Sequence, residues 1–341
     1  MRLLAPTLGV LPLLLPAQSQ AHIKWFCAYD TTVAPLPITK VLTPTFLAVA
    51  VLFCALMFTA YVVDRTVNAT QWAQRLDNRI FRSELCTTTI IRIAVGILFV
   101  ILWYGGSVIL TPELKTASPM IPWVQLAIAA SMLSRRALKF GAAGIMALYI
   151  FAVQQYGAFH LMDYPIFPAL ALYLALTGVG SPQLRALRMP LLYAGIAITM
   201  MWGAIEKFGY PYWTFPLLAE HPQITFGLGF DQFMCIAGFV ELSLAFFMVT
   251  GTALLRLSCA VLLTLLAGAV PEFGKIDAIG HLLIMAGLVT MIIAGQRTLQ
   301  LPARLVRSGV LVQAGTLTVG YSATVVVLFA LYYSSQFIAG R

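Results

Sequence analysis

Two apolar runs that follow one another decide the fold class of this chain. Residues 230–271 read FDQFMCIAGFVELSLAFFMVTGTALLRLSCAVLLTLLAGAVP. The runs 230–250 and 253–271 are separated only by Gly251 and Thr252. A helix of about 20 apolar residues crosses a hydrocarbon core of roughly 30 Å, so each run is long enough to span a bilayer. The stretch therefore predicts two consecutive transmembrane helices.

The composition extends this prediction to the whole chain. Of the 341 residues, 60% are apolar and only 10% are charged, whereas soluble domains average about 45–50% and about 25%. These values disfavour a water-soluble enzyme, a nucleic-acid-binding protein and a disordered tail. The five cysteines form no CxxC pair, which argues against an iron–sulfur cluster, a zinc ribbon or a disulfide framework. We expect an all-α polytopic membrane protein whose partner is the lipid bilayer.

About ten apolar stretches are long enough to span the membrane. We place them at 41–63, 88–110, 119–134, 138–156, 161–179, 190–208, 230–250, 253–271, 276–295 and 309–333. With the N-terminus of the mature chain outside, the inner segments hold fourteen Lys and Arg residues and the outer segments hold six, leaving out Arg2. The positive-inside rule requires this bias, so the net charge of +9 needs no nucleic acid. The C-terminus then also lies outside.

Three segments lie outside these spans. Residues 1–21 combine Arg2, an apolar run too short to span and a final Ser-Gln-Ala, which predicts a cleaved signal peptide; an uncleaved anchor is the alternative. Residues 22–40 would form an outer N-terminal segment. The inner loop 64–87 has apolar residues at steps of four beside arginines, which is typical of an amphipathic helix on the membrane surface. A solvated connector would explain that loop equally well.

The segments 88–180 and 190–295 have the pattern of two parallel four-helix units, with 41–63 and 309–333 as two extra helices. The runs that match are AVGILFVILW at 94–103 and YAGIAITMMW at 193–202, each with Gly and Trp seven residues apart. Parallel repeats are common in membrane folds. Apolar helices also match by chance, so duplication and coincidence both stay open.

If the units are duplicates, their differences indicate where the chemistry lies. Asp163 would correspond to Asp277, each opening the last span of its unit. The second unit has Glu241 where the first has Gln125, and it has a histidine, His281, where the first has a phenylalanine. The site is therefore expected in the second unit.

Ionisable residues at membrane depth are candidates for a functional site, because each costs a few kcal/mol there unless it is compensated. Glu241 lies about ten residues into its helix, roughly 15 Å from the outer surface. His281 follows Asp277 by four residues, so both share a helical face on which the carboxylate can orient the imidazole. We expect an outward-facing catalytic site of Glu241, His281, Asp277 and Glu206. The alternatives are a protonated Glu241 bonded to a neighbouring helix and a packing role for His281.

The outer loop 209–229 is unusually apolar and aromatic. Such a loop predicts a lid over a cavity for a flat apolar ligand such as a quinone. Trp202, Lys207, Tyr212 and Trp213 would bind that ligand. An aromatic belt on the lipid headgroups is the alternative for the loop, and an interface anchor is the alternative for Glu206, Lys207 and Trp202.

The four histidines, His22, His160, His221 and His281, all fall on the predicted outer side. Signal cleavage would give His22 a free α-amino group beside its imidazole, and such nitrogen ligands suit Cu(II). These four residues are therefore the candidate metal ligands, with copper as the metal.

Residues 190–295 resemble the DoxX-like family of small four-helix membrane proteins. The resemblance is carried by Gly203, Glu206, Lys207 and Phe208, by Glu241 within FVELSLAFFMVTG and by Gly280-His281. The run AHIKWF at 21–26 is similar to the mature start of uncharacterised bacterial membrane proteins that carry DoxX-like regions. The resemblance implies a protein of the bacterial inner membrane. Some relatives are subunits of thiosulfate:quinone oxidoreductase, and others are linked to thiol and oxidative stress.

These observations predict a redox-linked membrane subunit that acts on a quinone or on a sulfur or thiol substrate, with a partner subunit or the quinone as its redox partner. Whether the chain is itself an oxidoreductase stays open. A copper-binding or metal-delivery protein that uses His22 is the first alternative. A small-solute permease with Glu241 in its pathway is the second, and an inert assembly subunit is the third.

Overall fold

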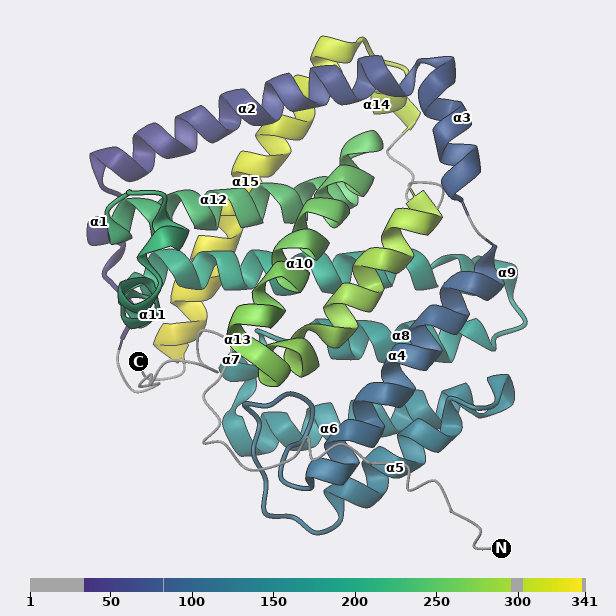
Figure 1. Cartoon of the computed structure of the whole chain (residues 1–341). Coiled ribbons are helices and arrows are strands. Elements are labelled where there is room, and N and C mark those ends of the chain that lie inside the picture. The colour runs from purple at the N-terminus through teal and green to yellow at the C-terminus, as the bar shows by residue number, and fades with distance from the viewer. Residues whose placement is uncertain (1–33, 82, 296–302, 339–341) are drawn as a thin grey trace, which may run out of the picture.

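The computed structural model describes residues 34–81, 83–295 and 303–338. The predicted signal peptide, His22 and most of the outer N-terminal segment therefore lie outside the described residues. In the described part every named element is a helix, apart from an isolated bridge between Val108 and Lys115. The prediction of an all-α polytopic membrane protein is confirmed (Figure 1).

The long helices carry most of the chain. They are α2 (Pro44–Asn68), α4 (Glu84–Gly105), α6 (Leu138–Tyr156), α10 (Arg188–Gly209), α12 (Phe230–Thr250), α13 (Ala253–Ala294) and α15 (Val310–Ile338). The short helices are α1 (Ile38–Val41), α3 (Gln71–Ile80), α5 (Ile121–Ser131), α7 (Ala158–Leu161), α8 (Ile166–Thr177), α9 (Pro182–Ala186), α11 (Phe215–Glu220) and α14 (Ala303–Val306). Single 3₁₀ turns lie at η1 (Arg135–Ala137), η2 (Pro211–Trp213) and η3 (Pro222–Thr225).

A kink divides α13 into two arms that form a V in front of α10 and α12 (Figure 1). Pro271 lies inside the helix and lacks the backbone N–H that an unbroken helix needs. Gly274 has φ 75°, a left-handed conformation that favours glycine. The two arms, Ala253–Pro271 and Phe273–Ala294, are each long and apolar enough to cross a membrane. They correspond to the expected spans 253–271 and 276–295.

Eight helices in the described chain are long and apolar enough to span a membrane. The expected spans at 119–134 and 161–179 are instead the short helices α5 and α8, of 11 and 12 residues. At 1.5 Å per residue they rise only about 16–18 Å, less than the hydrocarbon core. The prediction of ten full-length spans is thus corrected to eight long helices and two short ones.

A buried loop accounts for the shortness of α5. The connection 106–120 from α4 to α5 folds into the bundle, where Ile109, Leu110 and Leu114 are fully buried. The side-chain amide of Gln125 donates to the backbone oxygens of Val108 and Ile109, at 2.6 and 2.9 Å. The amide thus satisfies carbonyl groups that the loop carries into an apolar interior. Gln125 has a structural role.

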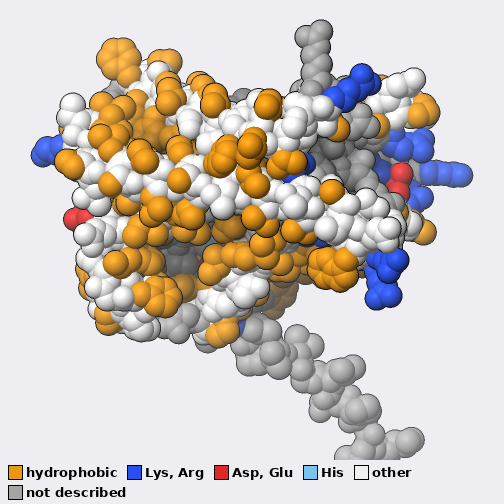
Figure 2. Space-filling model, turned by 90° about the horizontal axis from the view of Figure 1, so that it is seen from above, with side chains coloured by type: hydrophobic (Ala, Val, Ile, Leu, Met, Phe, Trp, Pro, Cys, Tyr) orange, Lys and Arg blue, Asp and Glu red, His pale blue; other side chains and the backbone are white. Residues whose placement is uncertain are grey.

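Polar contacts hold the loops and helix ends together at each of the two opposite ends of the bundle. At the α3 end, Arg256 pairs with Asp77 and Arg188 pairs with Glu84. At the α1 end, the Leu36 N–H donates to the Gly209 oxygen at 2.9 Å. Lys and Arg side chains gather at the α3 end, beyond a surface of hydrophobic side chains (Figure 2). These two ends are the predicted inner and outer sides.

The expected inner amphipathic segment forms a helix, α3. Thr70 caps it by accepting a hydrogen bond from the Ala73 N–H. Trp72 and Leu76 are exposed, while Asp77 on another face reaches Arg256. The helix is therefore tied to the bundle at Asp77 and leaves an apolar edge uncovered.

The two expected four-helix units pack on each other reciprocally. In the first unit, neighbours along the chain pack in the order α4, α5, α6 and α8, and in the second α10 packs on α12 and α12 on α13. Between the units, α8 packs on α10 and α13 packs on α4. The two extra helices, α2 and α15, pack on each other beside α12. This arrangement is what a duplication would produce, although the duplication itself stays a prediction.

Candidate functional site

A cavity of about 560 Å³ lies between α10, α12 and both arms of α13. Its walls are mostly apolar, with Val240 and Leu244 from α12 and Leu265 and Leu266 from α13. Leu265 is 57% exposed, so the cavity opens sideways on the apolar flank of the bundle. A ligand that enters from a lipid phase would meet this opening first.

Four ionisable residues among those described line this cavity: Lys207, Glu241, Asp277 and His281. All four were predicted from the sequence as site residues. The structure brings them together from α10, α12 and the second arm of α13. The second unit therefore holds a cluster of ionisable residues around one cavity, in the unit where the sequence predicts the site.

Lys207 and Glu241 form an ion pair between α10 and α12. Helical side chains lean towards the N-terminus of their helix, so Lys207, near the C-terminal end of α10, leans back into the bundle. Gly203, one turn earlier on α10, lies beside the carboxylate, and a Cβ there would be in ordinary van der Waals contact with Glu241 Oε1 at 3.8 Å. The side chains are 22% and 18% exposed. The pairing compensates two charges that would each be costly alone at this depth.

Asp277 and His281 form the second pair. The Nδ1 atom of His281 lies 3.0 Å from Asp277 Oδ1, and both side chains are buried. Asp277 Oδ2 is buried as well and has no hydrogen-bond partner among the described residues. A carboxylate in this position orients the imidazole. The pair therefore places a hydrogen-bonding imidazole of fixed orientation beside the cavity.

The apolar outer loop 209–229 covers part of the cavity, although the two loop residues predicted to bind a ligand, Tyr212 and Trp213, do not line it. Leu217, Ile224, Phe226 and Leu228 line it. Phe226 has φ 53° in a left-handed turn and is 89% exposed. This strained, exposed aromatic residue lies at the edge of the cavity.

A second hollow, of about 400 Å³, reaches the same ion pair from the α1 end. Lys40, Asp231 and Gln232 line it together with Lys207. Lys207 therefore lines both spaces. The ion pair lies between an apolar cavity that opens on the flank and a more polar hollow at the predicted outer end.

The structure places the remaining predicted ligand-binding residues outside the cavity. Trp202 is buried, with its ring 5.2 Å from that of Tyr332, and Trp213 stacks on Tyr210 at 3.8 Å. Tyr212 belongs to the same aromatic cluster at the α1 end. Glu206 is also absent from the cavity wall and lies within electrostatic reach of Tyr332. These four residues pack the α1 end, because they face α15 and the loop instead of α13.

The described histidines are not brought together. His160 Nε2 lies 2.9 Å from Glu113 Oε1, His281 pairs with Asp277, and the His221 ring contacts Phe273 at 5.8 Å. The described residues include no group of three or more His, Cys, Asp or Glu that could hold a metal ion. A copper role thus depends on His22, which lies outside the described residues.

Sequence reasoning missed a buried polar cluster in the first unit. The Tyr164 hydroxyl donates to Glu113 Oε2, while His160 approaches the other oxygen. Glu113 was not singled out because it follows an apolar span in a Thr-Pro-Glu-Leu stretch that reads as an exposed turn. No signal in the sequence indicates that this loop folds inward.

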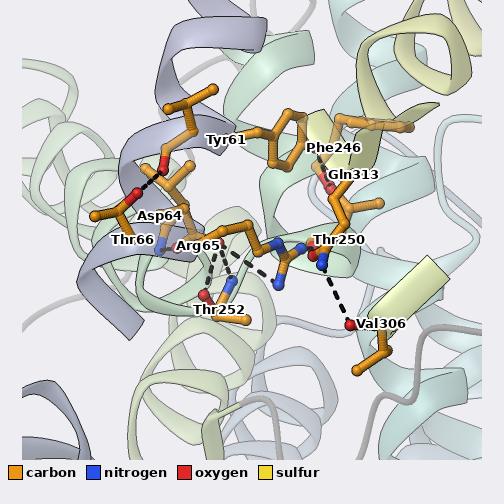
Figure 3. Close-up of polar contacts among 11 residues, drawn as sticks. Tyr61, Asp64, Arg65, Thr66, Phe246, Thr250, Thr252, Val306 and Gln313 are labelled. Atoms are coloured by element: carbon orange, nitrogen blue, oxygen red, sulfur yellow. Dashed lines mark hydrogen bonds and ion pairs between the residues drawn. The ribbon is translucent and has the colours of Figure 1, made fainter. Parts of the chain in front are cut away.

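A second missed group joins α2 to the corner between α12 and α13 (Figure 3). Asp64 accepts hydrogen bonds from the Thr252 N–H at 2.9 Å, the Thr252 hydroxyl at 2.6 Å and the Leu254 N–H at 2.8 Å. The neighbouring Arg65 donates to the Thr250 oxygen at 2.8 Å. Asp64 satisfies the first donors of α13, so its role is to cap that helix.

The fold and the site define a multi-pass, all-α membrane protein with a laterally open cavity that holds two acid–base pairs. Comparisons of the chain with protein-family models, curated proteins and solved structures find no match. They give the DoxX-like resemblance of residues 190–295 no support, so the function is argued from the site.

Proposed function

We propose that the chain is a redox-linked membrane subunit that binds a quinone in the cavity between α10, α12 and α13. The observation that carries the proposal is the combination of an apolar cavity open to the flank with four ionisable residues on its wall. Its volume of about 560 Å³ lies within the usual range of roughly 300–1,000 Å³ for small-molecule sites. A quinone has the matching form, with a polar ring and an apolar tail.

The polar groups suit the two ends of the quinone ring. The Lys207 ammonium can donate a hydrogen bond to one carbonyl oxygen, and a protonated His281 can donate to the other. The tail would leave past Leu265 into the bilayer. General acids must lie within hydrogen-bond reach of the atom they protonate, so the Lys207–Glu241 pair, through its ammonium, and His281 are the groups that would exchange protons with the bound ring.

A thiol is the donor class that we propose for this site. Two thiolates that join as a disulfide release two electrons, and the quinone takes up these electrons with two protons to become a quinol. The Lys207 ammonium, which Glu241 holds in place, and the protonated His281 each deliver one of these protons to a ring oxygen. The hollow at the α1 end would admit the water-soluble donor, and its Lys40 and Lys207 favour an anionic thiolate. We place this end outside a bacterial inner membrane, as the charge bias indicates.

Quinone binding by the purified protein in nanodiscs tests the proposal. We expect a short-chain ubiquinone or menaquinone analogue to bind, and Glu241→Gln, Lys207→Gln and His281→Gln each to weaken binding at least tenfold. Glu84→Gln is the matched control, because it removes a carboxylate from another interhelical ion pair, with Arg188, at the far end. Affinities that are equal in wild type, control and all three site variants would overturn the proposal.

A further inference from the structure

A much smaller cavity, separate from the quinone cavity and from the hollow at the α1 end, lies between the two four-helix units. Its volume is about 30 Å³, and its polar lining residues include Thr111 and Asp163 from the first unit and Thr199 and His281 from the second. A cavity needs roughly 10–15 Å³ of free volume to hold one water, which is held inside proteins by two to four polar partners. The small cavity has both the size and the polar lining for an ordered water.

One lining residue points independently to such a water. Thr111 is 3% exposed, and its hydroxyl has no hydrogen-bond partner among the described residues. Leaving a buried hydroxyl unsatisfied costs roughly 1–3 kcal/mol, so native structures nearly always supply a partner. A water in the small cavity would accept this hydrogen bond.

Polar groups continue from the small cavity in both directions. Tyr164 lines it and donates to Glu113, which His160 approaches on its other oxygen. The His160 ring stacks on Tyr156 at 5.5 Å, and the Tyr156 hydroxyl donates to the oxygen of the half-buried Lys115. In this direction the series of polar groups ends at Lys115, near the surface at the α1 end of the bundle.

On the other side, His281 lines the small cavity and the proposed quinone cavity alike. It belongs to the second unit, whereas Asp163 and Tyr164 belong to the first. The only described connection of these buried polar groups to the quinone cavity through the small cavity passes through this one imidazole. The interface between the units thus joins two separate polar clusters.

We propose that a water-bridged proton path runs from the Glu113–His160–Tyr164 cluster through the small cavity to His281. A proton enters at His160, passes through the Glu113 carboxylate and the Tyr164 hydroxyl, and crosses the water and Asp163 to His281. Each group releases one proton as it accepts another, so the path transfers protons while the net charge of its groups stays unchanged. The path rests on the proposed function only for the final acceptor, which is the quinone.

Other titratable groups surround this path. The Tyr149 and Tyr332 hydroxyls lie within electrostatic reach of Asp163, and Asp277 contacts His281. Asp163 and Asp277 are therefore the two carboxyl groups that face the path. Asp163→Asn would keep the shape of the side chain and remove the proton acceptor.

The chain has only four histidines, which makes ¹⁵N-histidine NMR in nanodiscs a suitable measurement. The quantity to measure is the exchange rate of the His281 ring proton with solvent, assigned by loss of the signal in His281→Gln. We expect Asp163→Asn and Tyr164→Phe to slow this exchange at least tenfold. Thr88→Val is the control, because it removes a buried hydroxyl contact, with Tyr173 at 3.3 Å, away from the small cavity.

Quinone affinity, measured on the same samples, separates the two proposals. Slower exchange in Asp163→Asn and Tyr164→Phe with wild-type quinone affinity supports the path and the site together. Slower exchange in a protein that binds no quinone supports the path and removes the proposed function. Wild-type exchange in both variants, with the folded spectrum retained, overturns the path whether or not quinone binds.

Discussion

Lys207 near the end of α10 and Glu241 in the middle of α12 form an ion pair on the wall of an apolar cavity. The lysine contributes a cation that is held inside the bundle by the direction in which helical side chains lean. The glutamate contributes the only carboxylate of α12 that lies in its middle turns. The two charges therefore compensate each other inside the bundle.

Removing one member of this pair should destabilise the protein more than removing both. Lys207→Met and Glu241→Met each leave a charge without its partner, for which about 3 kcal/mol is a typical cost in a buried pair. The double variant replaces both charges by apolar groups and should recover most of this loss. Reversible unfolding in mixed micelles measures the double-mutant cycle. Strictly additive losses would show that the two side chains do not interact.

Filling the proposed quinone cavity should block ligand binding without unfolding the protein. Ala237 lies on its wall, so Ala237→Phe places a ring in the space that a quinone would occupy. We expect quinone affinity to fall at least tenfold. Ala130→Phe is the matched control, because Ala130 lines a separate apolar groove of about 690 Å³ between α4 and α5. Equal loss in both variants would argue against the site, since a general effect on the bundle would explain it.

The cap at Asp64 should matter for stability and not for binding. Asp64→Ala removes one carboxylate that accepts three hydrogen bonds at the start of α13, and we expect a loss of about 3 kcal/mol. The group lies at the α3 end, far from the quinone cavity, so ligand affinity should stay unchanged. Thr66→Ala, on the exposed side of the same helix, should cost less than about 0.5 kcal/mol. Equal melting temperatures for both variants would disprove the capping role.

Two glycines at corresponding positions of the units should respond differently to the same substitution. A Cβ on Gly195 would overlap the Cβ of Ala169 on α8, so Gly195→Ala forces α8 and α10 apart and should cost about 1–3 kcal/mol. A Cβ on Gly96 would lie 3.7 Å from the nearest atom, which belongs to Met132. Gly96→Ala should therefore be neutral or gain up to about 1 kcal/mol from helix propensity. Unfolding of both variants measures the difference, and a reversed order would refute the packing argument.

The orientation in the membrane can be tested with single cysteines. In a chain whose five native cysteines are replaced, Ser118→Cys at the α1 end should react with an impermeant maleimide from outside intact cells. Ser181→Cys at the α3 end should react only after the membrane is opened, because the positive-inside rule places the arginines of that end in the cytoplasm. The opposite labelling pattern would invert the predicted topology.

The sequence predicted most of the helices because the bilayer imposes a length on each span. The apolar run 230–250 became α12 with the same bounds, and the run 309–333 became α15, which begins one residue later and ends five residues later. The hydropathy-based prediction of a full-length helix was wrong at α5 and α8. There a buried loop and short non-helical segments cover part of the distance across the membrane that a longer helix would cover. An apolar loop that folds inward has the same hydropathy as the end of a span, so composition alone could not distinguish them.

For the site, the sequence by itself determined which residues would be costly in a membrane. It identified Glu241, Asp277 and His281, because an ionisable group at membrane depth requires compensation wherever its partner lies. Lys207 was predicted only as a ligand-binding residue at the outer end of its helix. Only the tertiary structure decided which partners compensate them and that all four share one cavity, since these contacts depend on how α10, α12 and the two arms of α13 pack. The inward fold of Glu113 was likewise decided by packing, because nothing local in its sequence distinguishes it from a surface turn.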